Sequence, residues 1–178
     1  MLKRYYPGGY AQSVFHIDYQ KLYDRGYRGL IFDVDNTLVH HGDDSNEKVD
    51  ALFQKLHAMG FKTLLLSNNS AKRLERFKKN IDTQYIPEAG KPEPESYFKA
   101  LQMLELSKQQ VLCIGDQLFT DILGANRSGI DSILVHYIQV DPKAKIGIRR
   151  HVEKWILRCY GRSKSYQRLG DIRAEGEP

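Results

Sequence analysis

The sequence predicts an α/β fold, a three-layer Rossmann-like core in which helices cover both faces of a central parallel sheet. The first observation is that short apolar runs rich in branched side chains alternate with amphipathic segments of helical length. The second is that polar clusters directly follow several of these runs. The third is size, because 178 residues with 41% hydrophobic content supply one sizeable core and suit a single domain.

The elements are expected in the following order. Residues 1–26 form an irregular, tyrosine-rich lead-in, and the core extends over about residues 27–140. Buried strands are predicted at four apolar runs, residues 29–34, 61–67, 111–114 and 130–136. Helices are predicted where apolar residues recur at helical spacing, over residues 46–59, 70–79, 93–106 and 118–127. A turn marked by Pro87 leads to Lys91, on a loop between the second and third of these strands.

Charge is distributed unevenly along the chain. Residues 1–140 contain 17 basic and 17 acidic residues, so the whole formal surplus of +5 lies in residues 141–178. We expect this part to form a basic helix and a tail. Its partner could be anionic lipid, nucleic acid or an acidic protein, and a solvated face without a partner explains it equally well. Residues 161–178 contain few apolar residues and are expected to fray.

The basic helix carries an apolar stripe, formed by Ile148, Val152, Trp155, Ile156 and Cys159, opposite Arg149, Arg150, Lys154 and Arg158. This pattern is typical of a helix that lies on an anionic membrane, here through residues 146–160, and also of a helix that docks on its own domain. No stretch approaches the roughly 18 apolar residues of a membrane span, and the N-terminus lacks the apolar part of a signal peptide. We therefore expect a cytoplasmic protein, with peripheral membrane contact as one of the two interpretations of the helix.

Polar side chains gather where the predicted strands end. Asp33 and Asp35 follow the first strand, the run Ser67-Asn68-Asn69 follows the second, and Gly115-Asp116 follows the third. Because the carboxyl ends of parallel strands meet at one edge of a sheet, these side chains should lie together, within reach of Lys91. Three converging carboxylates, from Asp33, Asp35 and Asp116, would repel each other without a hard cation between them, and oxygen ligands favour Mg²⁺.

This constellation suits a phosphoryl group. The metal and Lys91 can neutralise its charge, which leaves Asp33 free to attack the phosphorus in line. Asp35 lies two residues further along an extended strand and returns to the same side, so it could protonate the leaving oxygen and then deprotonate a water molecule.

The run Asp33-Val34-Asp35-Asn36-Thr37-Leu38-Val39 resembles motif one of the haloacid dehalogenase superfamily, with Ser67 as motif two, Lys91 as motif three and Gly115-Asp116 with Asp121 as motif four. The resemblance implies a phosphatase in which Asp33 becomes an aspartyl-phosphate and Asp35 is the general acid and base. It implies that Ser67, Asn68 and Lys91 bind the phosphoryl group and that Asp33, Asp116 and the Asp35 carbonyl bind Mg²⁺. Thr37 and Asp121 would support this site, Asp121 through the metal shell or through Lys91.

Only nine residues, 40–48, separate motif one from the helix at Val49, so we expect no cap domain and a site open to large substrates. As far as about residue 160, the chain resembles the bacterial branch of capless, subclass III phosphatases that are related to phosphatidylglycerophosphate phosphatases. This implies a phosphate monoester substrate, phosphatidylglycerophosphate at a membrane surface. A soluble phosphate ester or a phosphoprotein is an alternative, and so is a non-catalytic protein that binds RNA or a ribonucleoprotein. Only charge supports the RNA interpretation, so nucleic acid is not the expected partner. The sequence leaves the oligomeric state open.

Overall fold

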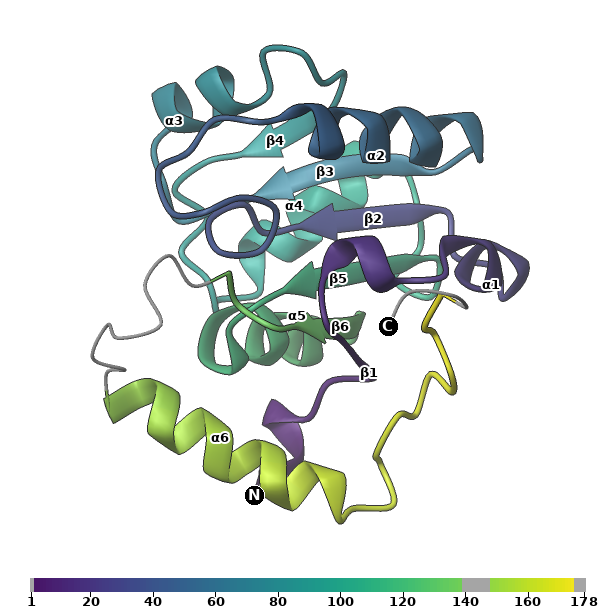
Figure 1. The fold of residues 1–178 in the computed structure, drawn as a ribbon, viewed down its shortest axis with the longest axis vertical. Helices are drawn as coiled ribbons and strands as arrows, with labels where there is room; N and C mark the ends of the chain where they lie inside the picture. Colours follow the sequence, from purple (N-terminus) through teal and green to yellow (C-terminus); the bar gives the residue numbers. More distant parts are fainter. Residues whose placement is uncertain (1, 139–147, 175–178) are drawn as a thin grey trace.

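The structure is a computed structural model that describes residues 2–138 and 148–174 (Figure 1). It contains one six-stranded sheet with the strand order β1-β6-β5-β2-β3-β4, and every neighbouring pair is parallel. The strands are β1 Gly9–Ala11, β2 Gly29–Phe32, β3 Lys62–Leu66, β4 Gln84–Ile86, β5 Val111–Gly115 and β6 Asp131–Val135. The predicted α/β fold with a parallel sheet is confirmed.

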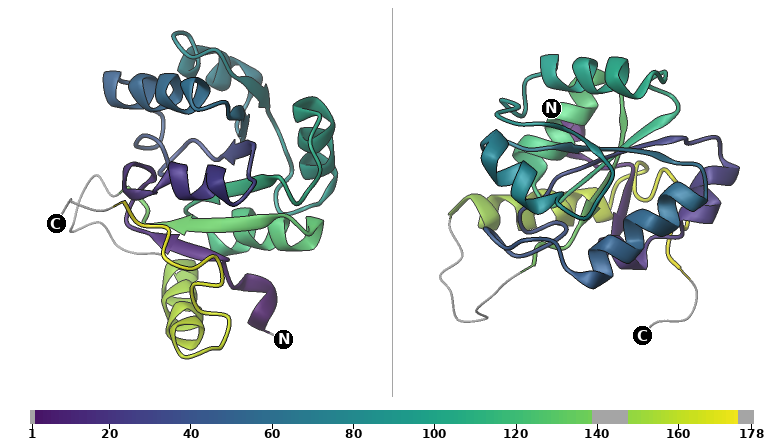
Figure 2. Two further views of the ribbon diagram at one scale, coloured as in Figure 1. Left: turned by 90° about the vertical axis from the view of Figure 1, so that its right-hand side faces the viewer. Right: turned by 90° about the horizontal axis from the view of Figure 1, so that it is seen from above.

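Helices pack on both faces of the sheet, as Figure 2 shows. On one face, α1 Tyr19–Asp24, α2 Glu47–Ala58 and α3 Ala71–Phe77 contribute to a core cluster with Phe32, Leu65 and Ile114. On the other face, α4 Glu95–Leu104 and α5 Leu123–Ser128 pack with Ile31, Leu64 and Cys113. Successive residues of a strand point to opposite faces, so the unbroken apolar runs supply both layers.

Two strands and several short helices differ from the expectation. The lead-in is not irregular throughout, because Gly9–Ala11 pairs with β6. It also contains α1 and two 3-10 turns, η1 Leu2–Tyr5 and η2 Val14–His16. Gln84–Ile86 pairs with β3 where only a turn was expected. Three residues are too few to show a periodicity, so only pairing with an existing strand defines such elements. The helix expected over residues 118–127 begins as a π-helical turn, η3 Leu118–Ile122, and continues as α5.

The basic helix, α6 Ile148–Gly161, docks on the domain beside η1 and η3. Ile156 is buried and forms a cluster with Leu118, Ile122 and Leu134. The expected single apolar stripe is therefore wrong, because Val152 and Trp155 remain 44% and 54% exposed. The buried face consists instead of Glu153, Ile156 and Tyr160, at positions i, i+3 and i+7. The side chains of Ile148 and Arg149, which were also assigned to these faces, lie outside the described residues.

The tail after α6 was expected to fray, but as far as residue 174 it packs on the domain. Ile172 is completely buried in the larger core cluster. The backbone N–H of Asp18 donates to the Ile172 carbonyl at 2.8 Å, and that of Leu169 donates to the Gly8 carbonyl at 2.9 Å. The tail therefore packs across the N-terminal segment, while residues 175–178 lie outside the described part. Among the described helices, none has the length and the apolar content that crossing a membrane requires.

Candidate active site

The carboxyl ends of β2, β3 and β5 point to the same side of the molecule (Figure 1). Asp33 directly follows β2, the central one of these strands, and its backbone N–H still donates to the Ile114 carbonyl of β5 at 2.9 Å. The chain then turns tightly, with the Val34 carbonyl accepting from the N–H groups of Thr37 and Leu38. Asn36 has a φ of 66° in this turn, a left-handed conformation that asparagine tolerates better than most residues. The turn places Thr37 back beside Asp33.

Lys91 bridges two carboxylates at the centre of the site. Its Nζ lies 2.7 Å from Asp33 Oδ1 and 2.6 Å from Asp121 Oδ1, and its side chain is only 4% exposed. The backbone of Lys91 is held by Asn68, whose Oδ1 accepts from the Lys91 N–H at 2.8 Å and whose Nδ2 donates to the Lys91 carbonyl at 3.3 Å. Asn68 therefore positions Lys91 through its backbone. From the sequence, Asn68 was expected to contact the phosphate.

Asp33, Asp116 and Asp121 form a buried acidic triad whose carboxylate oxygens lie within 4.8 Å of one another. The Thr37 hydroxyl donates to Asp33 Oδ2 at 3.1 Å and lies 3.3 Å from Asp116 Oδ1, so it links two of the three acids. Asp121 is held by the N–H of Gln117, at 3.1 Å. A Cβ on Gly115 would lie 2.4 Å from Asp121 Cγ, so only glycine allows this close approach.

The last helix contributes Arg150 to this site. Its guanidinium forms an ion pair with Asp116 Oδ2, and Nη1 also donates to the Asp116 carbonyl at 2.9 Å. Nη1 lies 2.9 Å from Glu153 Oε2, while Glu153 Oε1 accepts from the Leu118 N–H at 3.1 Å. The sequence assigned Arg150 to the face opposite the apolar stripe, which is wrong, because this side chain turns inward to the acids.

The charges of the site fit a hard divalent cation. Four buried carboxylates, those of the triad and Glu153, face the two cationic side chains of Lys91 and Arg150, which leaves two negative charges uncompensated in a desolvated place. All the ligand atoms that the triad offers are oxygens, the type that Mg²⁺ prefers. The residues present could therefore hold Mg²⁺ through Asp33 and Asp116, with Asp121 in contact with Lys91.

Burial dominates the protonation of these groups. It raises the pKa of Asp33 to about 6, against the attraction of Lys91 and with added repulsion from Asp121. It also raises the pKa of Asp116 to about 7, together with repulsion from Asp33 and Asp121 and against the attraction of Arg150. Burial alone would lower the pKa of Lys91, but the carboxylates of Asp121 and Asp33 outweigh it and raise this pKa. The lysine thus stays charged beside Asp33.

The side chain of Asp35 does not join the triad. Its Oδ1 accepts from the Gly42 N–H at 2.6 Å and from Arg73 Nη2 at 3.1 Å, and its Oδ2 accepts from Asn69 Nδ2 at 2.6 Å. The cluster of three carboxylates expected from Asp33, Asp35 and Asp116 is therefore formed with Asp121 in place of Asp35. Ser67 lies buried where β3 ends, and its Oγ accepts from the Asn69 N–H at 3.2 Å.

The sequence reasoning missed Asn69, Arg73 and Arg150 as members of the site. A signal for Arg73 was available, because it lies in the first turn of α3, which contains no acidic residue. A cation is unfavourable at the positive end of a helix dipole unless a carboxylate pairs with it. Asn69 adjoins Ser67 and Asn68 in the polar run after β3. For Arg150 no local signal exists, because its partner lies 34 residues earlier in the chain.

Comparisons with known proteins agree with this geometry. A family model for haloacid dehalogenase-like hydrolases matches residues 41–129, which include Ser67, Lys91, Asp116 and Asp121. The chain is 33% identical over 169 residues to the probable phosphatase YqeG of Bacillus subtilis (strain 168), covering 94% of this chain and 98% of that protein. It is 27% identical over 166 residues to the chloroplastic phosphatidylglycerophosphate phosphatase 1 of Chlamydomonas reinhardtii, covering 83% of this chain and 60% of that protein.

The fold also resembles a solved structure. A crystal structure of an uncharacterized protein from Listeria monocytogenes serotype 4b superimposes with a TM-score of 0.53 at 19% sequence identity, over 68% of this chain and 87% of that one. At this identity the likeness concerns the fold alone.

Proposed function

The chain belongs to the haloacid dehalogenase-like hydrolase family and is a phosphatase, and from this premise we propose that it hydrolyses a phosphate monoester through a phosphorylated Asp33 with the help of Mg²⁺. The observation that carries the proposal is the buried lysine bridge, in which Lys91 Nζ lies 2.7 Å from Asp33 and 2.6 Å from Asp121. Such a lysine orients the nucleophilic carboxylate and offers positive charge to a phosphoryl oxygen.

The residues divide the reaction between them. An Asp33 carboxylate oxygen attacks the phosphorus, the new P–O bond forms and the bond to the ester oxygen breaks. Asp35 donates a proton to the leaving oxygen. It later accepts the proton of the water molecule that hydrolyses the acyl phosphate. Lys91 and Ser67 neutralise and bind the phosphoryl oxygens. Mg²⁺, bound by Asp33, Asp116 and the Asp35 carbonyl, would offset the negative charge of the phosphoryl group.

For the substrate we propose phosphatidylglycerophosphate. The support is the similarity to the algal phosphatidylglycerophosphate phosphatase 1 and the short loop beside the site, since residues 40–46 connect motif one to α2 without a further helix or strand. The outer face of α6 gives additional support, because Trp155 and Val152 are exposed on this helix, which also carries the exposed, cationic Arg158. A tryptophan among basic residues suits the interface of an anionic membrane, so we propose peripheral attachment at the cytoplasmic side.

The test is release of phosphate from phosphatidylglycerophosphate in anionic vesicles with Mg²⁺, with para-nitrophenyl phosphate measured in parallel. We expect release that requires both the metal and Asp33, so that EDTA and Asp33→Asn each abolish it. Turnover of the generic ester alone would support the phosphatase activity but reject the lipid substrate, in favour of a soluble ester or a phosphoprotein. Nanomolar RNA affinity without turnover of either ester would instead reject the catalytic proposal.

A further inference from the structure

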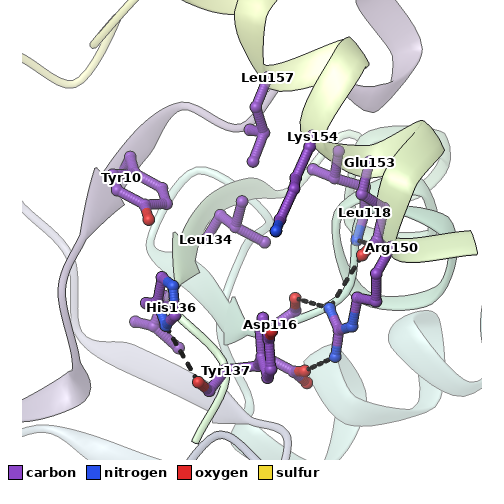
Figure 3. A pocket seen from close by; sticks show the side chains of 11 residues that line it. Tyr10, Asp116, Leu118, Leu134, His136, Tyr137, Arg150, Glu153, Lys154 and Leu157 are labelled. Atoms are coloured by element: carbon purple, nitrogen blue, oxygen red, sulfur yellow. Dashed lines mark hydrogen bonds and ion pairs between the residues drawn. The ribbon is translucent and has the colours of Figure 1, made fainter. Parts of the chain in front are cut away.

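A cavity of about 180 Å³ lies beside the acidic triad, between α6, β1 and the carboxyl end of β6 (Figure 3). Asp116 and Arg150 form part of its wall, so it adjoins the site at which the phosphoryl group is processed. Most of the remaining wall is apolar and includes Leu118, Leu134 and Leu157, next to the aromatic side chains of Tyr10 and Tyr137. The catalytic steps described above make no use of this space.

Three of the four carboxylate oxygens in the cavity wall already have a donor. Asp116 Oδ2 pairs with Arg150, whereas Oδ1 lies 3.3 Å from the Thr37 hydroxyl, which donates to Asp33. Glu153 Oε1 accepts from the Leu118 N–H and Oε2 from Arg150. The wall thus leaves one carboxylate oxygen without a donor, Asp116 Oδ1, and it belongs to the acid proposed above to hold Mg²⁺.

Lys154 is the charged group that remains. Figure 3 shows its side chain reaching from α6 into the cavity, on the side of Leu134 and Asp116. Within residues 2–138 and 148–174, no carboxylate forms an ion pair with it. Lys154 is exposed on α6, and its ammonium group, which lies beside leucine side chains and has no carboxylate partner among these residues, can bind an anion that also carries aliphatic carbon.

Resting on the proposed function, we propose that this cavity is a subsite for the non-reacting part of the substrate, in which Lys154 binds a phosphodiester anion and the leucines contact the carbon atoms next to it. Its volume suits a group of the size of glycerol phosphate, whereas two acyl chains would have to remain outside. A phosphatidylglycerophosphate molecule carries such a diester next to its terminal phosphate, and so does its deacylated, soluble form. The shared chemistry is therefore a phosphate monoester with a second, diester phosphate.

The first experiment compares kcat/KM for dihexanoyl phosphatidylglycerophosphate, below its critical micelle concentration, with kcat/KM for para-nitrophenyl phosphate. In Lys154→Gln we expect the ratio of the two to fall at least tenfold, because a charge-assisted contact is lost for the diester substrate alone. Lys99→Gln, which removes an exposed lysine from α4, is the matched control and should leave this ratio within about twofold. An unchanged ratio in Lys154→Gln would overturn the proposal.

A second variant and a binding measurement test the subsite independently, in case Lys154→Gln misfolds or the phosphatase assay shows no activity. Leu157→Phe adds bulk to the wall without changing charge and should lower the same ratio. Glycerophosphoglycerol, which carries the diester without a scissile phosphate, should bind to wild-type protein and bind at least tenfold more weakly to Lys154→Gln, by calorimetry or NMR titration. Absence of this binding in wild-type protein rejects the subsite even if the phosphatase is active. Binding without turnover of any ester rejects the proposed function and keeps the subsite.

The source of the ligand follows from two further assays. A higher kcat/KM for the dihexanoyl lipid than for its deacylated form, with both lowered in Lys154→Gln, supports the subsite and identifies a lipid substrate. The reverse order, again with both lowered, supports the subsite and identifies a soluble phosphodiester. Loss confined to anionic vesicles, with the soluble substrates unaffected, would show that Lys154 contacts the membrane and would reject the subsite.

Discussion

Arg150, on the last helix, pairs with Asp116, the acid that follows β5 at the centre of the sheet. The Asp116 side chain is fully buried and the Arg150 side chain is 21% exposed. The guanidinium also stacks over Tyr137, with Cζ 4.5 Å from the ring centroid. Through this one side chain, a helix outside the region matched by the family model becomes part of the acidic site.

We predict that Arg150→Gln lowers both stability and activity. The buried Asp116 carboxylate loses its charged partner, so we expect the free energy of unfolding to fall by about 2 kcal/mol, below the full effect of a buried pair because Arg150 is partly exposed. With Asp116 less firmly held, kcat/KM at saturating Mg²⁺ should fall about tenfold. Urea unfolding and steady-state kinetics measure the two effects.

The control is Arg158→Gln, which removes an exposed arginine from the same helix and should change the free energy of unfolding by less than about 0.5 kcal/mol. Equal stability of Arg150→Gln and wild type would contradict the structural role.

We predict that stabilisation by Mg²⁺ increases with pH. The raised pKa values of Asp33, about 6, and Asp116, about 7, mean that the folded, metal-free protein binds more protons than the unfolded chain between about pH 4 and 7. These two acids therefore reduce stability as pH rises through this range, and a bound cation relieves their repulsion. The increase of Tm caused by Mg²⁺ should be larger at pH 8 than at pH 5.5 in a thermal melt. Asp33→Asn should show a smaller increase, and an equal increase at both pH values in wild type would reject this account.

We predict that Arg73→Gln impairs catalysis more than it impairs folding. Arg73 holds the carboxylate of Asp35 together with Asn69 and Gly42, so its loss frees the proposed acid and base from its position. We expect kcat to fall about tenfold with little change in KM, and Arg73→Lys to restore part of the loss. The matched control is Arg76→Gln, on the same helix, whose guanidinium binds Asp44 and the Gly42 carbonyl at the surface. A similar loss of kcat in both variants would point to the loop as a whole and contradict a specific role of Arg73.

We predict that the tail is required for stability. Ile172 is completely buried in the larger core cluster, so Ile172→Ala should lower the free energy of unfolding by about 2 to 4 kcal/mol. Phe98→Ala, in which a 48% exposed ring is removed from α4, should cost less than about 1 kcal/mol. Chemical denaturation of the two variants checks the comparison. Wild-type stability of Ile172→Ala would show that residues 162–174 do not contribute to the core in solution.

The sequence alone was sufficient for the central part of the fold and for the order of the acidic motifs. Strands β2 and β5 are apolar throughout, and β3 and β6 each end in three apolar residues after two polar ones, because helices cover the sheet on both faces. Asp33 and Asp116 follow two of these strands directly, so their convergence follows from the parallel topology. Lys91 was assigned to the same edge by its place in the chain order, and it lies in contact with Asp33.

Which acids share the triad, and what neutralises them, depends on contacts that no local pattern contains. Asp121 contacts Lys91 as expected and also completes the triad in place of the Asp35 side chain, because Asn69 and Arg73 bind Asp35 while the glycine at position 115 lets Asp121 approach. Strands β1 and β4 exist only as partners of β6 and β3. In the sequence, Arg150 is one of several cations of a basic helix, and only the fold brings its side chain to Asp116. Periodicity and motif spacing report what a residue's near neighbours in the chain impose, whereas burial and charge compensation are decided by residues that only folding brings together.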